Sequence, residues 1–347
     1  MEKGSQNGSV IRVAEGSKSI LRSGCILIDK PAGFTSFDVV AKLRGMLHEK
    51  KIGHNGTLDP DATGLLEIFI GRGTKAVPLL SDHDKTYEAV LRLGIKTDTE
   101  DLSGQILSDR SDLVGNLTEE KIREAFSIIQ SRTSQIPPMY SAKKVGGKKL
   151  YEMARQGQEI ERKTVPIEIY ELRIEEISLP EVRFTAHVSK GTYIRTICSD
   201  IGDFLGTGAC MASLRRTKIG QTDVKDALSL EELQKLVDQD RAEDALIPLD
   251  QMFSYPKACA EPQADRYLLN GNPIYAEEVH FFSENGPDAE GPAGNLFSSA
   301  ESRDGFSGNS AGQKNSQVRL YLSDQKTFAG IFKKEGSLYK AVKIFLE

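Results

Sequence analysis

Cysteine is scarce in this sequence. The 347 residues include four cysteines, and none of them stands in a CxxC pair or has a histidine at metal-ligand spacing. Zinc sites and disulfide scaffolds need closely spaced ligands or several bridges, so neither is indicated. We therefore expect reduced, buried thiols and no bound metal. The four residues are Cys25, Cys198, Cys210 and Cys259.

Long apolar runs are lacking at the N-terminus. Residues 1–23 are rich in glycine, serine and charge, and they contain no apolar core of the roughly 7–15 residues that a signal peptide needs. They also lack the longer apolar run of a membrane anchor. We expect 1–22 to be a flexible tail and the protein to work in the cytoplasm, away from membranes. Walker loops, dinucleotide fingerprints and internal repeats are missing too, which excludes the common nucleotide-dependent classes.

The chain has no overall positive charge. Its formal net charge is −5, which argues mildly against nucleic-acid binding, because phosphates are usually neutralised by a basic surface. The charges are unevenly distributed. Residues 131–160 carry six Lys or Arg and two Asp or Glu, whereas residues 221–250 carry three Lys or Arg and nine Asp or Glu. A local basic face is therefore compatible with the sequence. Hydrophobic residues (39%) and charged residues (27%) are at globular levels, so most of the chain should fold.

Apolar spacing predicts short elements in the first hundred residues. Residues 25–28 suit a buried strand closed by a Lys-Pro-Ala-Gly turn, and a helix should begin at Ser36, its expected N-cap. Residues 51–64 contain three glycines and a proline without sustained periodicity, which predicts a loop. The apolar run 65–70 and the alternating run 87–93 predict two strands of one sheet.

Similar patterns continue along the chain. Thr118 should cap a second amphipathic helix, and residues 165–177 and 182–188 should be strands, followed by a helix with isoleucines inward. Ser229 and Glu232 form a capping box that opens another helix. We expect this domain to end near residue 249.

A smaller module is expected at the C-terminus. Strands at 318–322, 328–333 and 341–346 indicate a β-rich unit that begins upstream, near Tyr267. Residues 284–317 hold six glycines and six serines, so they bury too little apolar surface to offset their ordering entropy. The predicted organisation is a tail (1–22), a catalytic domain (23–250) and a module (251–347) with a disordered insertion at about 284–317.

Asp59 is the residue whose surroundings suggest chemistry. It lies between Leu58 and Pro60 in the glycine-bounded segment KIGHNGTLDPDATG, where the proline restricts the backbone. A carboxylate held at a fixed angle can act as a nucleophile or a base. An Asp-Pro dipeptide also suits a simple turn, so the residues of this segment alone leave both interpretations open.

Several further motifs accompany this segment. KIGHNGTLDPDATG, KTYEAVLRLG, SKGTYIRT and SLRRTKIG occur in the order and spacing of bacterial tRNA pseudouridine synthases, together with IDKPAGFTSFDVV and QIPPMYSAKKVGGKKLYEMARQG. Over residues 24–249 the chain resembles the TruB family of tRNA pseudouridine-55 synthases. The resemblance implies an α+β pseudouridine synthase fold with a mixed, largely antiparallel sheet and flanking helices. It thins over the C-terminal strands, which are similar to a PUA-like RNA-binding module.

The resemblance also implies a reaction. The family breaks the N-glycosidic bond of a uridine, rotates the base and rejoins it to the ribose through C5, without redox change and without a cofactor. The aspartate that matches Asp59 is the family's catalytic residue. It acts by attack on the sugar or the base, or as a base toward the sugar, and the sequence does not choose among these routes.

Four positions match residues of the family's uridine pocket. Arg195 is expected to pair bidentately with Asp59 and to keep its carboxylate charged, against the rise in pKa that burial would cause. Tyr87 is expected to stack on the target base and to help move its C5 proton. Tyr193 and Leu214 are expected to enclose the base. Without the match, these would be ordinary core or surface residues.

The resemblance implies RNA contacts outside the pocket as well. His54 matches a histidine that occupies space left in the RNA by extruded nucleotides. The lysine pairs at 143–144 and 148–149 are expected to contact phosphates. Two positions depart from the family: Asn55 stands where many relatives have threonine, and Asp61 where a hydrophobic residue is common.

The leading hypothesis is an enzyme that acts alone, as a monomer, on the T-arm stem-loop of tRNA and converts uridine 55 to pseudouridine after flipping the base. Two alternatives stay open. One is a tRNA-binding or tRNA-folding protein without turnover, because basic and aromatic residues alone would serve binding. The other is a guide-RNA-dependent enzyme of the dyskerin type, against which the lack of an obvious lysine-rich tail counts.

Overall fold

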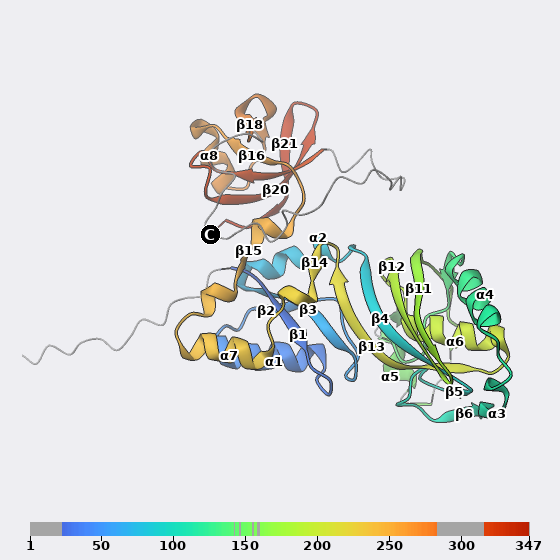
Figure 1. Cartoon of the computed structure of the whole chain (residues 1–347). Helices are drawn as coiled ribbons and strands as arrows, with labels where there is room; N and C mark the ends of the chain where they lie inside the picture. Colours follow the sequence, from blue (N-terminus) through green and yellow to red (C-terminus); the bar gives the residue numbers. More distant parts are fainter. Residues whose placement is uncertain are drawn as a thin grey trace, which may run out of the picture.

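The structure is a computed structural model that describes residues 23–141, 143–145, 147–154, 156–157, 160–282 and 316–346. The expected N-terminal tail (1–22) and nearly all of the expected Ser/Gly-rich insertion (284–317) lie outside the described residues. Within the described chain, a large sheet with helices forms one domain and a smaller β-rich module, coloured orange to red in Figure 1, lies beside it.

A nine-stranded sheet is the centre of the larger domain. Its main order is β11-β12-β4-β13-β3-β1-β15, with β2 paired to β3 and β14 to β13. Every pairing is antiparallel except β13 with β3, which is parallel over two residue pairs. The predicted mixed, largely antiparallel sheet is confirmed. The strands are β1 (Gly24–Lys30), β2 (Ile52–Asn55), β3 (Thr63–Ile70), β4 (Lys85–Leu93), β11 (Ile169–Ser178), β12 (Glu181–Val188), β13 (Ala209–Ile219), β14 (Thr222–Asp223) and β15 (Ile247–Pro248).

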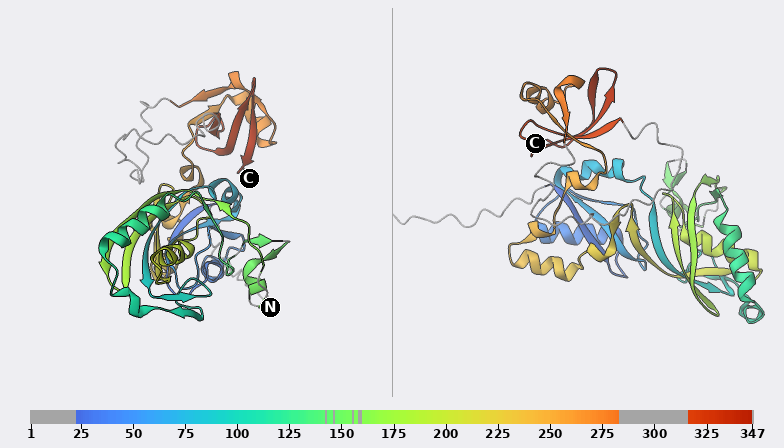
Figure 2. Two further views of the ribbon diagram at one scale, coloured as in Figure 1. Left: turned by 90° about the vertical axis from the view of Figure 1, so that its right-hand side faces the viewer. Right: turned by 45° about the horizontal axis from the view of Figure 1, so that its top comes forward.

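Two pairs of helices cover different parts of this sheet (Figures 1 and 2). Helices α1 (Ser36–Leu47) and α7 (Leu230–Asp238) pack against β1, β2 and β3, whereas α4 (Glu119–Gln130) and α6 (Ile194–Leu205) pack against β4, β11, β12 and β13. The alternation predicted for 182–188 is confirmed, because every second side chain of β12 is buried in the cluster under α4 and α6. The inward isoleucines of α6 are buried in the same cluster.

Helix starts follow the expected chemistry with one correction. Thr118 caps α4, and Ser229 forms its capping box with Glu232 at α7, as predicted. The N-cap of α1 is Thr35 and not Ser36: the Thr35 hydroxyl accepts from the Asp38 backbone N–H, and the Asp38 carboxylate accepts from the Thr35 N–H. Ser36 is unavailable as a cap because its hydroxyl points inward and bonds another loop.

The prediction of a loop over residues 51–64 is wrong at its two ends. Residues Ile52–Asn55 form strand β2, which pairs with β3 from Ile52 opposite Ile70 to Asn55 opposite Glu67. Residues 63 and 64 belong to β3, so the loop is confined to 56–62. Strand β2 has too few apolar residues to show alternation, and it is defined by its hydrogen bonds to β3.

The C-terminal module is a six-stranded sheet of order β17-β21-β20-β19-β16-β18. Its first strand, β16 (Lys257–Ala260), lies within the predicted module (251–347) but upstream of Tyr267, where its β-rich part was expected to begin. The three predicted C-terminal strands are present as β19, β20 and β21, the last of which begins three residues before the predicted 341–346 run. The other elements of the module are α8 (Pro262–Leu269), β17 (Ile274–Tyr275), β18 (Val279–Phe281), β19 (Gln317–Tyr321), β20 (Phe328–Glu335) and β21 (Leu338–Ile344).

The module packs against the sheet of the larger domain. Ile331 and Phe345 of the module share one apolar cluster with Cys25 and Leu65, which lie on β1 and β3. The neighbouring Ile26 points the other way, into the cluster under α1 and α7. Strand β1 is therefore buried on both faces, as its continuous apolar run requires.

All four cysteines are free. Three of the thiols are buried, and Cys259 is partly exposed. No described helix is long and apolar enough to cross a membrane.

Shorter elements complete the described chain. They are η1 (Gly71–Ala76), α2 (Val77–Leu80), β5 (Ile95–Thr97), β6 (Ile106–Asp109), α3 (Ser111–Val114), β7 (Ser134–Gln135), β8 (Lys144–Val145), β9 (Lys148–Lys149), α5 (Leu150–Ala154), β10 (Val165–Pro166), η2 (Val224–Asp226), η3 (Ala242–Ala245), η4 (Leu249–Met252) and η5 (Ala276–Glu278).

Candidate active site

A cavity of about 1070 Å³ opens where the β2–β3 loop, β4, β13 and the start of α6 meet. These segments are far apart in the sequence, and the two halves of the sheet bring them together at the short parallel contact of β13 with β3. All six residues expected at the site line this one cavity: His54, Asp59, Tyr87, Tyr193, Arg195 and Leu214.

The backbone before Asp59 is fixed by Ser36. The Ser36 hydroxyl accepts a hydrogen bond from the Leu58 N–H (2.9 Å) and lies 3.3 Å from the Leu58 carbonyl, to which it donates. Ser36 is 1% exposed, so both bonds are sheltered from water. The first turn of α1 thus holds the residue that precedes Asp59.

The backbone after Asp59 is fixed by the turn that follows β1. The carbonyl of Pro60 accepts from the Lys30 ammonium (3.0 Å) and from the Gly33 N–H (2.9 Å). The Lys30 ammonium also donates to the Phe34 carbonyl at 2.6 Å, and burial lowers the pKa of this lysine. The motif IDKPAGFTSFDVV therefore supports the Asp59 loop from both sides, a function that the sequence analysis did not predict.

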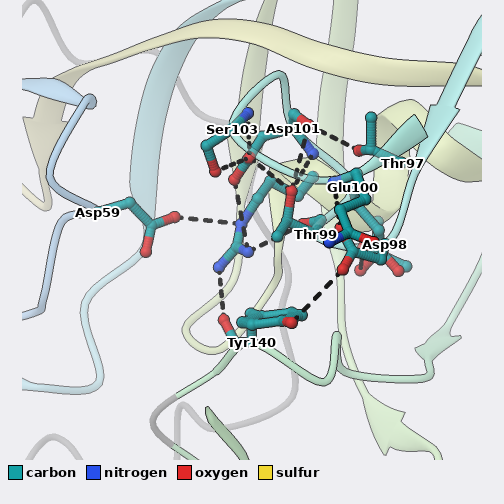
Figure 3. A network of polar contacts seen from close by, with 11 residues as sticks. Asp59, Thr97, Asp98, Thr99, Glu100, Asp101, Ser103 and Tyr140 are labelled. Carbon is teal, nitrogen blue, oxygen red and sulfur yellow. Dashed lines mark hydrogen bonds and ion pairs between the residues drawn. The ribbon is translucent and has the colours of Figure 1, made fainter. Parts of the chain in front are cut away.

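Arg195 lies in the first turn of α6 and faces this loop. Its Nε forms an ion pair with Oδ2 of Asp59 at 3.1 Å (Figure 3). Its two terminal nitrogens donate to backbone carbonyls, Nη1 to Thr99 (3.0 Å) and Nη2 to Tyr140 (2.9 Å). The expected bidentate pair with Asp59 is therefore wrong, because the Nη atoms are engaged by the carbonyls and only Nε reaches the carboxylate.

Asp101 supplies a second carboxylate to the same guanidinium, and the sequence pattern did not predict it. Its Oδ2 lies 3.7 Å from Nη1 of Arg195, and its side chain is 18% exposed. Oδ1 accepts from the Thr99 hydroxyl (2.7 Å) and from the Ser103 N–H (2.9 Å), as Figure 3 shows. The segment TDTEDLSG looks like an ordinary acidic turn, and only the fold places one of its acids against Arg195.

Burial raises the pKa of Asp59, and the negative charges of Asp101 and Asp61 add to the rise. The positive charges of Arg195 and Lys30 oppose it without cancelling it. Arg195 acts in the expected direction, but partial removal of the carboxylate from water is the largest effect, so the pKa still rises. The side chain remains 41% exposed, so the carboxylate is accessible from the cavity.

Aromatic and apolar side chains form the opposite wall. Tyr87 on β4 and Leu214 on β13 are partly buried and pack on the cluster under α4 and α6. Tyr193 is the N-cap of α6, and Gln135 holds its backbone twice: the amide oxygen accepts from the Tyr193 N–H (2.9 Å), and the amide nitrogen donates to its carbonyl (3.0 Å). Gln135 is 4% exposed and belongs to the QIPPMYS motif, whose positioning function sequence analysis did not identify.

His54 lies on β2 at the edge of the cavity beside a buried cation. Burial, followed by the positive charge of Arg216, lowers the pKa of His54, which favours the neutral ring. Arg216 donates from Nε to the Leu65 carbonyl (2.8 Å) and from Nη2 to the Gly56 carbonyl (3.1 Å). These bonds tie the β2–β3 loop to β13.

Gly64 permits the close approach of β3 to β13. A Cβ at this position would lie 2.2 Å from the Arg216 carbonyl oxygen, and the backbone has φ of +102°. Any larger residue would separate the two strands and, with them, the halves of the cavity.

Asn55, one of the two departures from the family, is a buried structural residue at the base of the cavity. Its Nδ2 donates to Oε2 of Glu67 (2.8 Å) and to the Leu80 carbonyl (3.2 Å). Glu67 also accepts from the Thr222 hydroxyl at 2.9 Å, and burial raises the pKa of its carboxyl group. Asp61, the other departure, is exposed beside Asp59.

The lysine pairs expected to contact phosphate lie near the hairpin of β8 and β9. Lys143 is partly buried, and the side chains at 144, 148 and 149 lie outside the described ones. Among the described residues, no three His, Cys, Asp or Glu side chains are arranged to hold a metal ion.

Two family models match consecutive parts of the chain. Residues 44–194 match the TruB family pseudouridylate synthase N-terminal domain, and residues 195–254 match the tRNA pseudouridylate synthase B C-terminal domain. The chain is 46% identical over 255 residues to tRNA pseudouridine synthase B of Alkaliphilus oremlandii (strain OhILAs), covering 73% of this chain and 83% of that protein. It is 41% identical over 272 residues to the protein of that name from Geobacter sulfurreducens, covering 78% of this chain and 88% of that protein.

Two solved structures are similar in fold. A chain of an H/ACA RNP bound to a substrate RNA containing 2′-deoxyuridine has a TM-score of 0.63 and 21% identity. A chain of a Cbf5-Nop10-Gar1 complex has a TM-score of 0.65 and 22% identity. Each comparison covers 93% of this chain and 85% of the other. At this identity the likeness establishes the fold alone.

Proposed function

The chain belongs to the TruB family of pseudouridylate synthases, and from this premise we propose that it converts a uridine of tRNA, uridine 55 of the T loop, to pseudouridine. The observation that carries the proposal is the pairing of Asp59 with Arg195 in a cavity that all the expected site residues line. The proposal is supported by relatives named tRNA pseudouridine synthase B that share 41–46% identity over most of their length.

The reaction exchanges the N1–C1′ bond of uridine for a C5–C1′ bond. N1 gains a proton and C5 loses one, so atoms and electrons balance without an oxidant or a reductant. Asp59 is the group proposed to start the exchange, as a carboxylate that attacks or accepts a proton. Arg195 holds Oδ2, and Oδ1 has no hydrogen-bond partner among the described residues, which leaves this oxygen for the substrate.

The loop geometry favours such a step because the reacting group is held before substrate arrives. Ser36 fixes the residue before Asp59, and Lys30 fixes the carbonyl after it. A carboxylate placed in this way does not have to be ordered during the reaction, which lowers the entropic part of the barrier.

The cavity walls suit a flipped uracil. Tyr87 is proposed to stack on the base and to assist removal of the C5 proton, with Tyr193 and Leu214 enclosing the ring. A neutral His54 at the cavity edge can lie among RNA bases without attracting a phosphate, which supports its proposed place in the space left by extruded nucleotides.

We further propose that the protein recognises the T arm directly, as a monomer in the cytoplasm. The close relatives are named for tRNA, whereas the likeness to subunits of RNA-guided complexes is confined to 21–22% identity. Direct recognition is therefore the better supported mode. The C-terminal module (251–347) is proposed to add RNA contacts.

A direct assay tests the proposal. Purified protein is incubated with unmodified tRNA and with an isolated T-arm stem-loop, and the RNA is digested and analysed for pseudouridine. We expect conversion of one uridine in both substrates. Absence of pseudouridine in both would reject the function, and conversion of the tRNA alone would reject recognition of the isolated arm.

A further inference from the structure

Phe37 is an aromatic residue that the fold does not bury. It is the second residue of α1 and the most exposed phenylalanine in the described part of the chain, with 62% of its surface open. Three residues earlier, Phe34 packs against the apolar cluster beneath α1 and meets the need for a core contact there. The stability of α1 therefore does not explain an aromatic ring at position 37.

The position of Phe37 is more informative than its exposure. It lines the same cavity as Asp59 and follows Ser36, whose hydroxyl bonds the backbone of Leu58. Single exposed apolar residues are common on protein surfaces and need no explanation. This ring instead lines the catalytic cavity, where it can contact RNA whose flipped uridine reaches Asp59.

A cation accompanies the ring. The guanidinium carbon of Arg44 lies 5.7 Å from the ring centroid of Phe37, and Nη2 of Arg44 is anchored on the Ile52 carbonyl at 3.2 Å. Lys42 stands in the same relation to Phe34, also at 5.7 Å. In the described structure neither cation has a salt bridge to a carboxylate, so both charges are available to an anion.

We propose that Phe37 and Arg44 form a platform on which one unpaired base of the RNA, beside the flipped uridine, stacks. This inference rests on the proposed function. An aromatic face accepts any base, and the adjacent guanidinium adds attraction for the phosphate backbone. The aromatic-cation chemistry and the continuity with the cavity favour a single-stranded stretch of RNA as the occupant.

Kinetics with matched variants test the platform. Phe37→Ala, Phe37→Tyr and Phe204→Ala are compared with wild type for conversion of a T-arm stem-loop at constant salt. Phe204 is the control, because it is 43% exposed on α6 and does not line the cavity. We expect kcat/KM of Phe37→Ala to fall roughly 5- to 100-fold, with kcat little changed, since stacking contributes mainly to binding.

The two control variants make the result specific. Phe37→Tyr should keep most of the wild-type kcat/KM because it keeps the ring, and Phe204→Ala should match wild type. Equal kcat/KM for Phe37→Ala and wild type would overturn the platform. An equal fall in kcat/KM for Phe37→Ala and Phe37→Tyr would overturn it too. These outcomes require an active wild type; an inactive wild type would instead reject the proposed function.

Abasic substrates then identify the partner base. Stem-loops that each lack one loop base are assayed with wild type and Phe37→Ala. Removal of the base that stacks on Phe37 should lower kcat/KM of the wild type. The same removal should not lower kcat/KM of Phe37→Ala any further. Independent losses at every position would show that no base rests on Phe37 and would overturn the proposal.

Discussion

Arg195 forms an ion pair with Asp59, with Nε 3.1 Å from Oδ2, and so connects the first turn of α6 to the β2–β3 loop. The guanidinium is almost fully buried, and its Nη1 and Nη2 donate to the carbonyls of Thr99 and Tyr140. The guanidinium is therefore held in place by α6 and by the segments that contain Thr99 and Tyr140. In turn, it orients the carboxylate of Asp59. The arrangement defines the orientation of Asp59 from the side opposite to Ser36 and Lys30.

Replacing Asp59 with asparagine should abolish turnover and spare RNA binding. Asparagine has nearly the same shape but is a poor nucleophile and no base at neutral pH, so we expect single-turnover conversion to fall by at least about 1000-fold. Binding of a T-arm stem-loop, measured by fluorescence anisotropy, should change by less than about threefold, because the side chain is not the main phosphate contact. Measurable turnover near the wild-type rate would remove Asp59 from the catalytic role.

Arg195→Lys should show that the shape of the guanidinium matters as well as its charge. A lysine ammonium cannot serve Asp59 and two carbonyls in the same plane, so at least one buried carbonyl loses its donor. We expect a loss of roughly 1–3 kcal/mol in the free energy of unfolding and a fall of about 100-fold in kcat.

Urea denaturation and single-turnover kinetics measure the two effects of Arg195→Lys. Lys96→Met is a suitable control, because Lys96 pairs with Asp203 at an exposed position outside the cavity. If Arg195→Lys kept wild-type kcat, orientation of Asp59 by the planar fork would be disproved.

The sequence was a good guide to which residues meet and a poorer guide to how they meet. Tyr87, Arg195 and Leu214 could be placed with Asp59 because their motifs match a family pattern. The geometry of the Arg195 pair could not be predicted, since it depends on backbone carbonyls from two other segments. A carbonyl leaves no signature in the sequence.

Residues with an ordinary local pattern were also missed. Asp101 lies in an acidic turn whose composition suits a solvated loop, and only the docking of this turn beside β13 brings it to Arg195. Ser36 was predicted to be the helix cap because serine and threonine share the same capping chemistry. The adjacent Thr35 occupies the cap position instead. The four-residue strand β2 escaped detection because tertiary pairing with β3, and not propensity, determines it.

The pH dependence of turnover should reflect the charge at position 61. Burial and the charges of Asp101 and Asp61 raise the pKa of Asp59. If the ionised carboxylate is the reactive form, the rate falls as the pH drops through this raised pKa. Asp61→Asn removes one of the charges that disfavour ionisation, so it lowers the pKa of Asp59 and shifts the acid limb of the profile to lower pH.

Single-turnover rates between pH 5 and pH 8 check the shift. Asp112→Asn is the control for net charge, because Asp112 is exposed on α3 and outside the cavity. It should leave the profile unchanged. A shift of the acid limb to higher pH in Asp61→Asn, or the same shift in both variants, would contradict the electrostatic argument.

Ser36→Ala should reduce kcat through the backbone of the Asp59 loop, although Ser36 itself is not required to touch substrate. The variant leaves the buried N–H of Leu58 without its acceptor, which costs roughly 1–3 kcal/mol of stability. The residue next to Asp59 is then free to shift, and a displacement of a fraction of an ångström is enough to lower kcat by about 10-fold.

Ser229→Ala separates this effect on kcat from a loss of stability in general. It removes the N-cap of α7, a loss of about 1 kcal/mol, in a helix that does not line the cavity. Both variants should melt earlier than wild type, but only Ser36→Ala should turn over more slowly at saturating RNA, with KM nearly unchanged. Equal kcat values in the two variants would mean that the hydroxyl of Ser36 stabilises the fold without positioning the catalytic loop.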